Sequence, residues 1–443
     1  MITTFLKPAP SIHDHQGRIS KFLIFETSNH LLPYDNDEKI VFAALREKYR
    51  PLIKGFHDVD PNKEFVIFFS CSKHGNYPQP WHDSKRKTWF FPIVTSKRSP
   101  ALPSRWVQDI IVFAGSGLLG FNSSLVSRDL ASVLAEKLRL PDYDFLPGYM
   151  QGGNILTGTF GEKRFLLIGK TTTEQQEHAD MRRILRQKYL LNCYDKATMG
   201  KLQKIFFHLD YYTALVGGIS GNECNVYLLQ IFFDPGKSLN SIRPEGDIVK
   251  LPQQAGTNPD PKLNFVAIKV PIVIFRRPAA VKKDKNWEQG ISDNDIDLVL
   301  SYANCHVENY MDGKKNIIRI FMPDFSDAVI RFYESRLKWD EYQEAFADGL
   351  EMLEHNFSLW KKSGPSSPRS RKFFGKQEVY DVNFIRDLFT DIQEYTREYI
   401  KKELGDKTFN RKVSVIFIPH AFYELARRSG SLHCMSKVLE RDI

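Results

Sequence analysis

Five short motifs of this 443-residue chain contain residue types that catalysis uses. In chain order they are RWVQD (105–109), QGGNI (151–155), FHLDYY (207–212), SYANC (301–305) and SGSLHCMS (429–436). A cysteine thiolate is a nucleophile, and histidine exchanges protons near neutral pH. Each motif also has a purely structural interpretation, so residue type alone does not decide its role.

His208 and Asp210 form one candidate pair, because they lie two residues apart in an apolar context. In an extended chain, two such side chains point to the same side. A buried His–Asp pair is costly unless it is hydrogen-bonded. The sequence therefore leaves two interpretations open, a satisfied structural pair and an acid–base unit.

Cys434 is the candidate nucleophile. Lone cysteines are most often inert small side chains of a core. A cysteine that follows a Gly/Ser turn and lies beside a histidine, here His433, can instead be held as a thiolate. Elsewhere, Trp106 and Asp109 are typical of an anchor and a cap before an apolar strand, and the Gly152-Gly153 pair is typical of a turn.

The elements that must position these motifs alternate between strands and helices. Strand-like runs of β-branched and aromatic residues occur at 65–69, 110–114, 164–169, 225–233, 265–275, 316–322 and 413–418. Helical patterns lie between several of them, at 127–140 and 180–191 for example. The alternation predicts an α/β fold or a repeated mixed unit, whose repeats have diverged beyond recognition by eye.

Two segments interrupt this alternation. Residues 236–262 contain four prolines and are predicted to form a long surface loop. From about 330 to 410 the sequence becomes strongly helical, and within it the linker 361–376 contains six basic residues and no acidic one. Such a run is usually a solvated loop, although it would also fit an acidic partner or a membrane surface.

Composition limits the classes of protein that are possible. Hydrophobic residues make up 42% and charged residues 26%, which excludes a wholly disordered or collagen-like chain. The formal net charge is +9, but it falls to +3 without the linker 361–376, so no nucleic-acid partner is expected. Five widely spaced cysteines indicate neither a disulfide framework nor a zinc site.

Targeting features also restrict the compartment in which the protein is expected. The first residues lack the apolar stretch of a secretory signal, and the longest apolar run, 110–121, is too short to span a bilayer. We expect a cytoplasmic protein, and an effector injected into a host would have the same features. The oligomeric state is not indicated.

Taken together and in this order, the motifs W-V-Q-D, G-G-N, H-x-D, S-Y-A-N and H-C resemble those of the guanidino-group-modifying superfamily. Agmatine deiminases and bacterial peptidylarginine deiminases are the most similar members. NFVAIKVPIVIFRRP (264–278) resembles that family's strand before its fourth blade, and 301–332 and 413–436 resemble its S-Y-x-N blade and its catalytic turn. The likeness covers about 104–436, apart from 236–262 and roughly 335–411.

This resemblance implies one catalytic domain over 1–443, a five-bladed α/β propeller called the pentein fold. It also implies a loop insertion at 236–262, and a helical insertion at 335–411, before the last blade. Catalytic roles are implied for Cys434 as nucleophile, His208 as acid–base, and Asp109 and Asp210 as carboxylates that grip the substrate. Substrate contacts are implied for Asp109, Asp210, Asn304, Trp106, Gly153 and Asn154. No metal or organic cofactor is implied.

The implied reaction converts a guanidinium to a ureido group and ammonia. A guanidinium stays cationic and offers planar N–H forks, so two carboxylates can hold it and orient its central carbon. Its positive charge also favours the attacking thiolate. The expected substrate is arginine-like, namely a protein arginine, free arginine or agmatine.

Three departures from the family lie near the expected pocket. Gln108 stands where agmatine deiminases have Arg, Gln151 stands where they have an acidic residue, and the glycine-rich run before the cysteine is reduced to Ser429-Gly430-Ser431. Agmatine is therefore the less favoured of the three substrates. Val112 occupies the place of a calcium ligand of the animal enzymes, so calcium control is not implied.

Three functions remain open from the sequence. One is a deiminase that uses Cys434, and the second is an amidinotransferase, in which an amine replaces water in the second step. The third is a catalytically silent pentein that binds a partner through the basic linker. The joint presence of Cys434, His208, Asp109 and Asp210 favours an enzyme.

Overall fold

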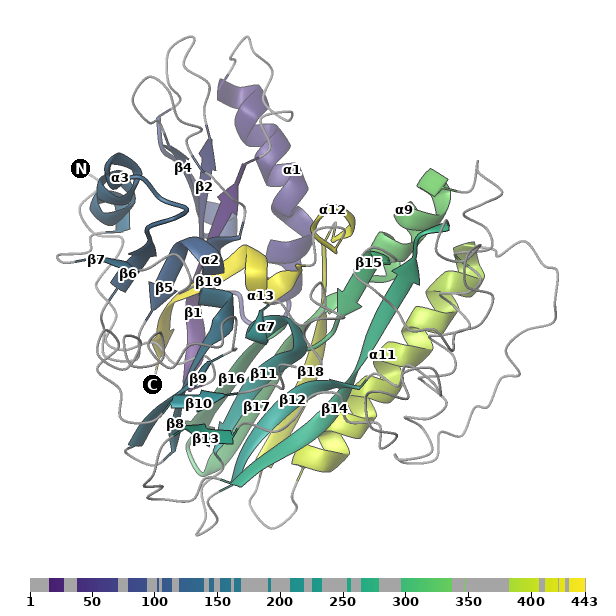
Figure 1. Cartoon of the computed structure of the whole chain (residues 1–443). Coiled ribbons are helices and arrows are strands. Elements are labelled where there is room, and N and C mark those ends of the chain that lie inside the picture. The colour runs from purple at the N-terminus through teal and green to yellow at the C-terminus, as the bar shows by residue number, and fades with distance from the viewer. Residues whose placement is uncertain are drawn as a thin grey trace.

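The computed structural model gives a mixed α/β protein with several small sheets (Figure 1). It describes residues 16–27, 38–70, 79–93, 102, 106–113, 119–138, 143–146, 152–160, 163–168, 190–192, 208–218, 225–232, 253–255, 264–278, 296–336, 346, 382–405, 411–420, 422–426 and 430–442.

Five sheets are present in the described part of the chain. The first has the order β19 (Ser436–Asp442), β1 (Arg18–Glu26), β2 (Glu64–Ser70), β4 (Thr88–Ile93) and β3 (Trp81–Asp83). The second contains β5 (Ile111–Phe113), β6 (Leu119–Asn122) and β7 (Asp144–Leu146). The third has the order β13 (Gln253–Ala255), β10 (Leu190–Asn192), β9 (Lys163–Ile168) and β8 (Ile155–Phe160).

The other two sheets come from the second half of the chain. One has the order β11 (Thr213–Gly218), β12 (Asn225–Phe232), β14 (Asn264–Arg276) and β15 (Ile296–Ser301). The other contains β16 (His306–Asp312), β17 (Lys315–Asp324) and β18 (Arg411–Pro419). Their strands are rich in Val, Ile and Phe, which suits strands buried on both faces.

All five sheets share one topology. Each begins with an edge strand, continues with a strand antiparallel to it, and adds a third strand parallel to the second. The units are β19-β1-β2, β5-β6-β7, β8-β9-β10, β11-β12-β14 and β16-β17-β18. The first sheet is built from both ends of the chain, since β19 comes from the C-terminal part and pairs with β1.

The long helices connect the parallel strands of these units. Helix α1 (Glu38–His57) lies between β1 and β2, and α3 (Arg128–Leu138) lies between β6 and β7. Helices α9 (Ser326–Arg336) and α11 (Val382–Leu404) lie between β17 and β18. Parallel neighbours require such crossovers, because a tight turn can join only antiparallel strands.

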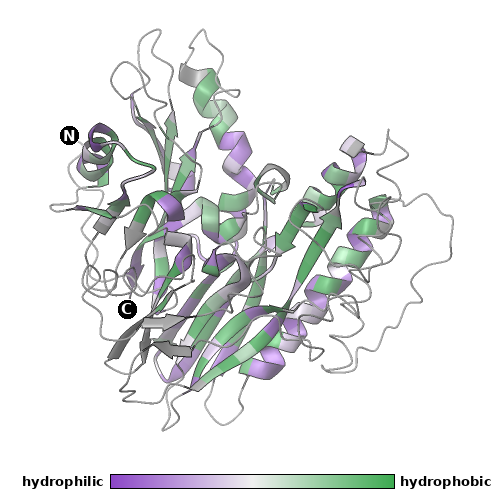
Figure 2. Cartoon of the chain, viewed as in Figure 1, coloured by the Kyte–Doolittle hydropathy of each residue, from purple (hydrophilic) through white to green (hydrophobic). Residues whose placement is uncertain are grey.

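Helices and sheets share a large apolar core. Helix α3 buries Leu130, Leu134 and Leu138, which recur every four residues and form one face. Figure 2 shows that the strands are mostly apolar, whereas α1 and α11 carry both apolar and hydrophilic residues. None of the helices in the described part combines the length and the apolar character that a membrane crossing requires.

Most of the predicted elements are confirmed. All seven predicted strands are present, as β2, β5, β9, β12, β14, β17 and β18, and the helical pattern at 127–140 is α3. The predicted helical character after residue 330 is confirmed by α9 and α11. The basic linker 361–376 lies outside the described residues.

Two predictions of local structure are wrong. The predicted helix 180–191 ends in a strand, since Leu190 and Leu191 belong to β10 and pair in parallel with Leu166 and Leu167. The predicted loop 236–262 contains β13, which pairs with β10. In both places the backbone pairs with a partner far away in the chain, and a short run of sequence does not reveal that partner. The rest of both segments lies outside the described residues.

Candidate active site

The five motifs lie at equivalent places in the five sheets, each directly before the edge strand of its unit. The short helices α2 (Val107–Ile110), α7 (Leu209–Tyr212) and α13 (Leu432–Met435) precede β5, β11 and β19, and the single turn η3 (Gly152–Asn154) precedes β8. The turn 302–305 precedes β16. Helix α13 contacts α2 and α7, and η3 contacts the same two helices, so the motifs meet near the middle of the molecule (Figure 1).

Cys434 lies at the centre of this meeting point and is buried. Asn304 Nδ2 donates to its Sγ atom at 3.0 Å, and Sγ itself lies 3.4 Å from Asp210 Oδ2. Burial, and then the charges of Asp210 and Asp109, raise the pKa of this thiol well above its usual value. The sequence left open an inert core side chain and a thiolate, and the raised pKa favours the neutral thiol in the ligand-free protein.

Asp210 is almost fully buried, at 1% exposure. Its Oδ2 atom lies 2.8 Å from His433 Nδ1, and its Oδ1 atom has no hydrogen-bond partner among the described residues. A buried carboxylate oxygen without a partner is unusual, because its desolvation is not compensated. Such an atom marks a place where a ligand with N–H groups would be held.

His208 and Asp210 do not share an extended strand, so that part of the prediction is wrong. His208 has extended backbone angles, but Asp210 belongs to the helical turn α7, which removes the alternation of a strand. Both side chains nevertheless face Gly153. A Cβ atom on Gly153 would lie 2.8 Å from His208 Nδ1 and 3.0 Å from Asp210 Oδ1, so the close approach requires glycine.

Asp109 is the second carboxylate of the cluster. Its Oδ1 atom lies 3.5 Å from His208 Nδ1. Burial raises the pKa of Asp109 to about 6, Asp210 adds to this effect, and His208 and Lys437 oppose it. The cluster is therefore an acidic site in which the protein's own cations only partly balance the negative charge.

Gly152 and Asn154 hold α2 and α7 in place. A Cβ atom on Gly152 would lie only 1.8 Å from the carbonyl oxygen of Gln108, so the backbones of η3 and α2 are in direct contact. Asn154 Oδ1 accepts from the main-chain N–H of Leu209 at 3.0 Å and caps the start of α7. Asn154 Nδ2 is buried without a partner among the described residues.

Asn304 organises the turn that carries the cysteine. Its Oδ1 atom accepts from the main-chain N–H groups of His433 and Cys434 and from the Ser431 hydroxyl, at 2.9, 3.2 and 2.9 Å. Its Nδ2 atom also donates to the carbonyl oxygen of Asp210, at 3.0 Å. The resemblance assigned Asn304 to the substrate, whereas these bonds give both ends of its amide a protein partner.

Trp106 and Gln108 pack α2 against the segment 430–437, which contains Cys434. The indole of Trp106 lies against Gly430, where a Cβ atom would come within 2.4 Å of the ring. Gln108 Nε2 donates to the carbonyl oxygen of Ser436 at 2.9 Å, and Lys437 Nζ donates to Gln108 Oε1 at 2.6 Å. Gln108, one of the departures from the family, therefore joins α2 to β19. Gln151 and Ser429 lie outside the described residues.

Two histidines of the site were not among the site residues predicted from the sequence, although His433 was noted there as the neighbour of Cys434. His433 contacts Asp210, as described above, and its ring lies 4.9 Å from that of His306. His306 Nε2 is 2.7 Å from the Ser436 hydroxyl oxygen. The position of His433 beside Cys434 was a usable signal, but His306 has none, because only the pairing of β16 with its neighbours brings it to the site.

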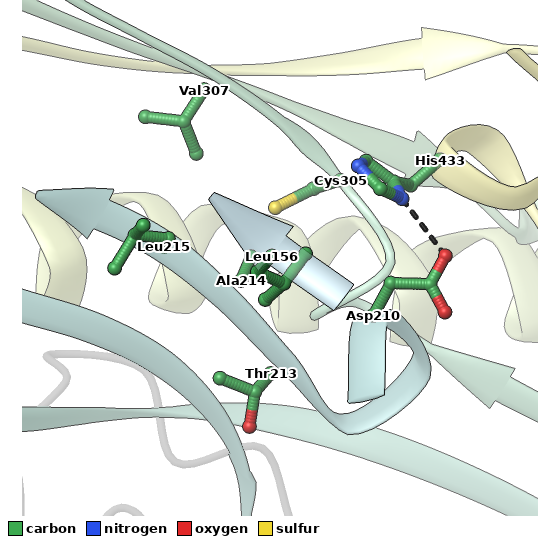
Figure 3. A pocket seen from close by; sticks show the side chains of 8 residues that line it. All are labelled: Leu156, Asp210, Thr213, Ala214, Leu215, Cys305, Val307 and His433. Carbon is green, nitrogen blue, oxygen red and sulfur yellow. Dashed lines mark hydrogen bonds and ion pairs between the residues drawn. The ribbon is translucent and has the colours of Figure 1, made fainter. Parts of the chain in front are cut away.

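A small hollow of about 10 Å³ lies beside Asp210 and His433 (Figure 3). Its walls include Leu156 of β8, Leu215 of β11 and Val307 of β16. These walls are apolar, so the Asp210–His433 pair lies in surroundings of low dielectric, where a hydrogen bond is stronger than in water. Within the described residues, no group of three or more His, Cys, Asp or Glu side chains is arranged to hold a metal ion.

Comparison with protein-family models finds no match for this chain, and comparison with the curated proteins finds none either.

Proposed function

We propose that the five sheets form one five-bladed α/β propeller of the pentein type. The shared topology of the five units supports this, since each sheet would be one blade with its edge strand innermost. Contacts between neighbours also follow a ring: β1 contacts β16, β16 contacts β11, and β11 contacts β8. Turn η3 then contacts both β8 and β5, and α2 contacts both β5 and β19. The ring closes because β19 pairs with β1.

We further propose that the protein is a deiminase that hydrolyses the guanidinium of an arginine-like substrate. One observation carries this proposal: the buried Oδ1 atom of Asp210 has no hydrogen-bond partner among the described residues and belongs to a carboxylate that also lies 3.4 Å from the Cys434 thiol. A guanidinium held there would place its carbon beside the sulfur. Asp109, whose charge acts on the same thiol, would bind the opposite N–H groups.

The first half of the reaction begins when the cation binds. Burial and the two carboxylates raise the pKa of the thiol; the charge of the cation offsets the carboxylates, and the thiol proton passes to His208. The thiolate attacks the guanidinium carbon and a C–S bond forms. His208 then returns the proton to a departing –NH2 group, the C–N bond breaks, and ammonia leaves behind an S-alkylthiouronium on Cys434.

The second half consumes one water. His208, now neutral, removes a proton from this water as its oxygen attacks the same carbon. The C–S bond breaks and the sulfur recovers the proton from His208. The added hydroxyl gives up its own proton to the released ammonia, which becomes ammonium, and a neutral ureido product leaves. For an arginine side chain the product is citrulline. Asn304 holds the turn that presents Cys434, and the proton transfers use the side chains of His208 and Cys434.

The proposal is tested by measuring ammonia and ureido product after incubation with free arginine, agmatine, and peptides or proteins that contain arginine. We expect product with at least one of them, and a loss of at least 1000-fold in Cys434→Ala, because the covalent route is then closed. Absence of product with every substrate, or equal product in the variant, would contradict the proposal. A new guanidino compound formed only when glycine or ornithine is added would instead indicate an amidinotransferase.

A further inference from the structure

We infer that His433 is a positioning residue that fixes the orientation of the Asp210 carboxylate and so decides which of its oxygens faces the substrate. This inference rests on the proposed deiminase function. His433 is not assigned to the substrate in the scheme above, and its contribution would be made through Asp210.

The contact between the two side chains is direct and buried. His433 Nδ1 lies 2.8 Å from Asp210 Oδ2, and the two residues are 6% and 1% exposed. The terminal torsion of an aspartate is broad, so the side-chain rotamer alone does not fix the plane of the carboxylate. A hydrogen bond to one oxygen does fix it, and here it leaves Oδ1 facing Gly153 and His208.

His433 is itself firmly held. Its main-chain N–H donates to Asn304 Oδ1 at 2.9 Å, and its ring packs against His306 at a centroid distance of 4.9 Å. His306 is anchored in turn by the Ser436 hydroxyl. Burial lowers the pKa of His306 well below its usual value, which favours the neutral form of this ring. The imidazole is thus a rigid support rather than a mobile side chain.

The apolar hollow strengthens the hydrogen bond between His433 and Asp210 Oδ2, an oxygen that also lies 3.4 Å from the Cys434 thiol. Figure 3 shows His433 and Asp210 at one end of the hollow, with the bond between them and with Val307 and Leu215 among the side chains around it. The described side chains on this side of the pair are mostly apolar. Groups that bind a reacting substrate must be held to within about 0.5 Å, and a displacement of about 1 Å can reduce the rate about 100-fold.

A purely structural role for His433 predicts a different result from a positioning role. A structural histidine would lower stability when it is replaced, but the remaining folded protein would still prefer cations. A positioning histidine would change how strongly the site prefers a planar cation over a neutral molecule of the same shape. The preference for a cation is therefore the quantity to measure.

The test compares alkylation of Cys434 by chloroacetamidine, a planar cation, with alkylation by chloroacetamide, which is neutral and has the same shape and leaving group. The rates at Cys434 are followed by mass spectrometry of its peptide in the full-length protein.

Three variants are used. His433→Asn keeps an N–H donor where Nδ1 lies, His433→Gln moves it towards the place of Nε2, and His433→Ala removes it. His420→Ala is the matched control, since it removes a buried imidazole that stacks on Tyr49 instead.

We expect the wild type to prefer the amidine, and this preference to fall at least tenfold in His433→Ala and His433→Gln. It should stay within about threefold of wild type in His433→Asn and in the control. An unchanged preference in the alanine and glutamine variants would overturn the inference, and so would an equal loss in all three. If the wild type shows no preference for the amidine and forms no ureido product, the proposed deiminase function is contradicted. This outcome is distinguishable from failure of the inference about His433, in which the wild type keeps its preference. Circular dichroism confirms that each variant is folded, and the asparagine and glutamine variants decide the matter if the alanine variant unfolds.

Discussion

Burial of Asp109 lowers the stability of the folded protein, but the same carboxylate is suited to bind a cation. Burial raises its pKa to about 6 from an ordinary value of 3.8, so its ionised form is disfavoured in the folded protein. A cationic ligand would remove that penalty, because its positive charge would stabilise the ionised carboxylate of Asp109. The residue is therefore costly to the ligand-free protein and useful to a complex with a cation.

The stability cost of Asp109 can be measured through pH. The folded pKa is raised, so between about pH 4 and pH 6 the native state binds more protons than the unfolded state, and stability falls as pH rises through this window. At pH 7 the full cost is present. We therefore expect Asp109→Asn to raise the free energy of unfolding at pH 7 by about 3 kcal/mol, and by almost nothing at pH 4.

Urea unfolding at both pH values measures this difference. Asp144→Asn, on the exposed β7, is the matched control and should change stability by less than about 0.5 kcal/mol at either pH. The same Asp109→Asn variant should lose about 100-fold in kcat/KM, since a charged hydrogen bond to the substrate is lost. A variant that is destabilised equally at pH 4 and pH 7 would show that the carboxylate is not under strain.

At the scale of elements, the same arrangement of a short turn before an edge strand occurs five times. A turn of three or four residues precedes each edge strand, and the polar side chains of these turns meet. Because a turn of this length is too short to fold alone, its position depends on hydrogen bonds to the other turns. Asn304 supplies several of these bonds, reaching both α7 and α13.

Replacing Asn304 tests how these turns depend on one another. In Asn304→Ala the main-chain N–H groups of His433 and Cys434 and the carbonyl oxygen of Asp210 lose a buried partner. We expect a loss of about 3 kcal/mol in the free energy of unfolding, measured with urea. Asn316→Ala is the matched control, because the Asn316 side chain is also buried but is bonded only to Asn309 and Met311 among the contacts described, and it should cost about 1 kcal/mol. Equal losses in both variants would argue against a special role for Asn304.

At the scale of the molecule, the sheets are joined by buried polar groups as well as by the core. Lys63, directly before β2, and Glu308, on β16, form an ion pair between two sheets, and both are fully buried. Lys63 Nζ also donates to the carbonyl oxygen of Ile19 at 2.6 Å, and the Ile19 N–H donates to Glu308 Oε1 at 2.9 Å. This network fastens β1, the strand that pairs with the C-terminal β19, to its neighbour.

Lys63→Met tests whether this network holds the two sheets together. Glu308 would keep a buried charge with weaker compensation, so we expect a loss of about 3 kcal/mol in the free energy of unfolding in urea. Adding Glu308→Leu should recover part of the loss, because the unpaired charge is then removed, while the Ile19 N–H loses its acceptor. Lys54→Met, which breaks an exposed ion pair with Asp58, should change stability by less than about 1 kcal/mol. A double variant no more stable than the single one would contradict this account.

The sequence by itself determined much of the local structure and the identity of the candidate site. Runs of β-branched and aromatic residues produced the seven predicted strands, since those side chains pack well on a buried sheet. The motif order also picked out Cys434, His208, Asp109 and Asp210, which the structure brings together. Residue types reveal such groups because few other side chains can perform nucleophilic or acid–base chemistry.

Only the tertiary structure decided how those groups are paired and charged. Asp210 and His433 are 223 positions apart, and nothing in either motif predicts their hydrogen bond. The neutral state of the Cys434 thiol likewise depends on burial and on carboxylates from two other sheets. Strand β10 formed at the end of a helical pattern because β9 and β13 offered it partners. Desolvation and pairing depend on neighbours in space, and for this chain those neighbours come from distant parts of the sequence.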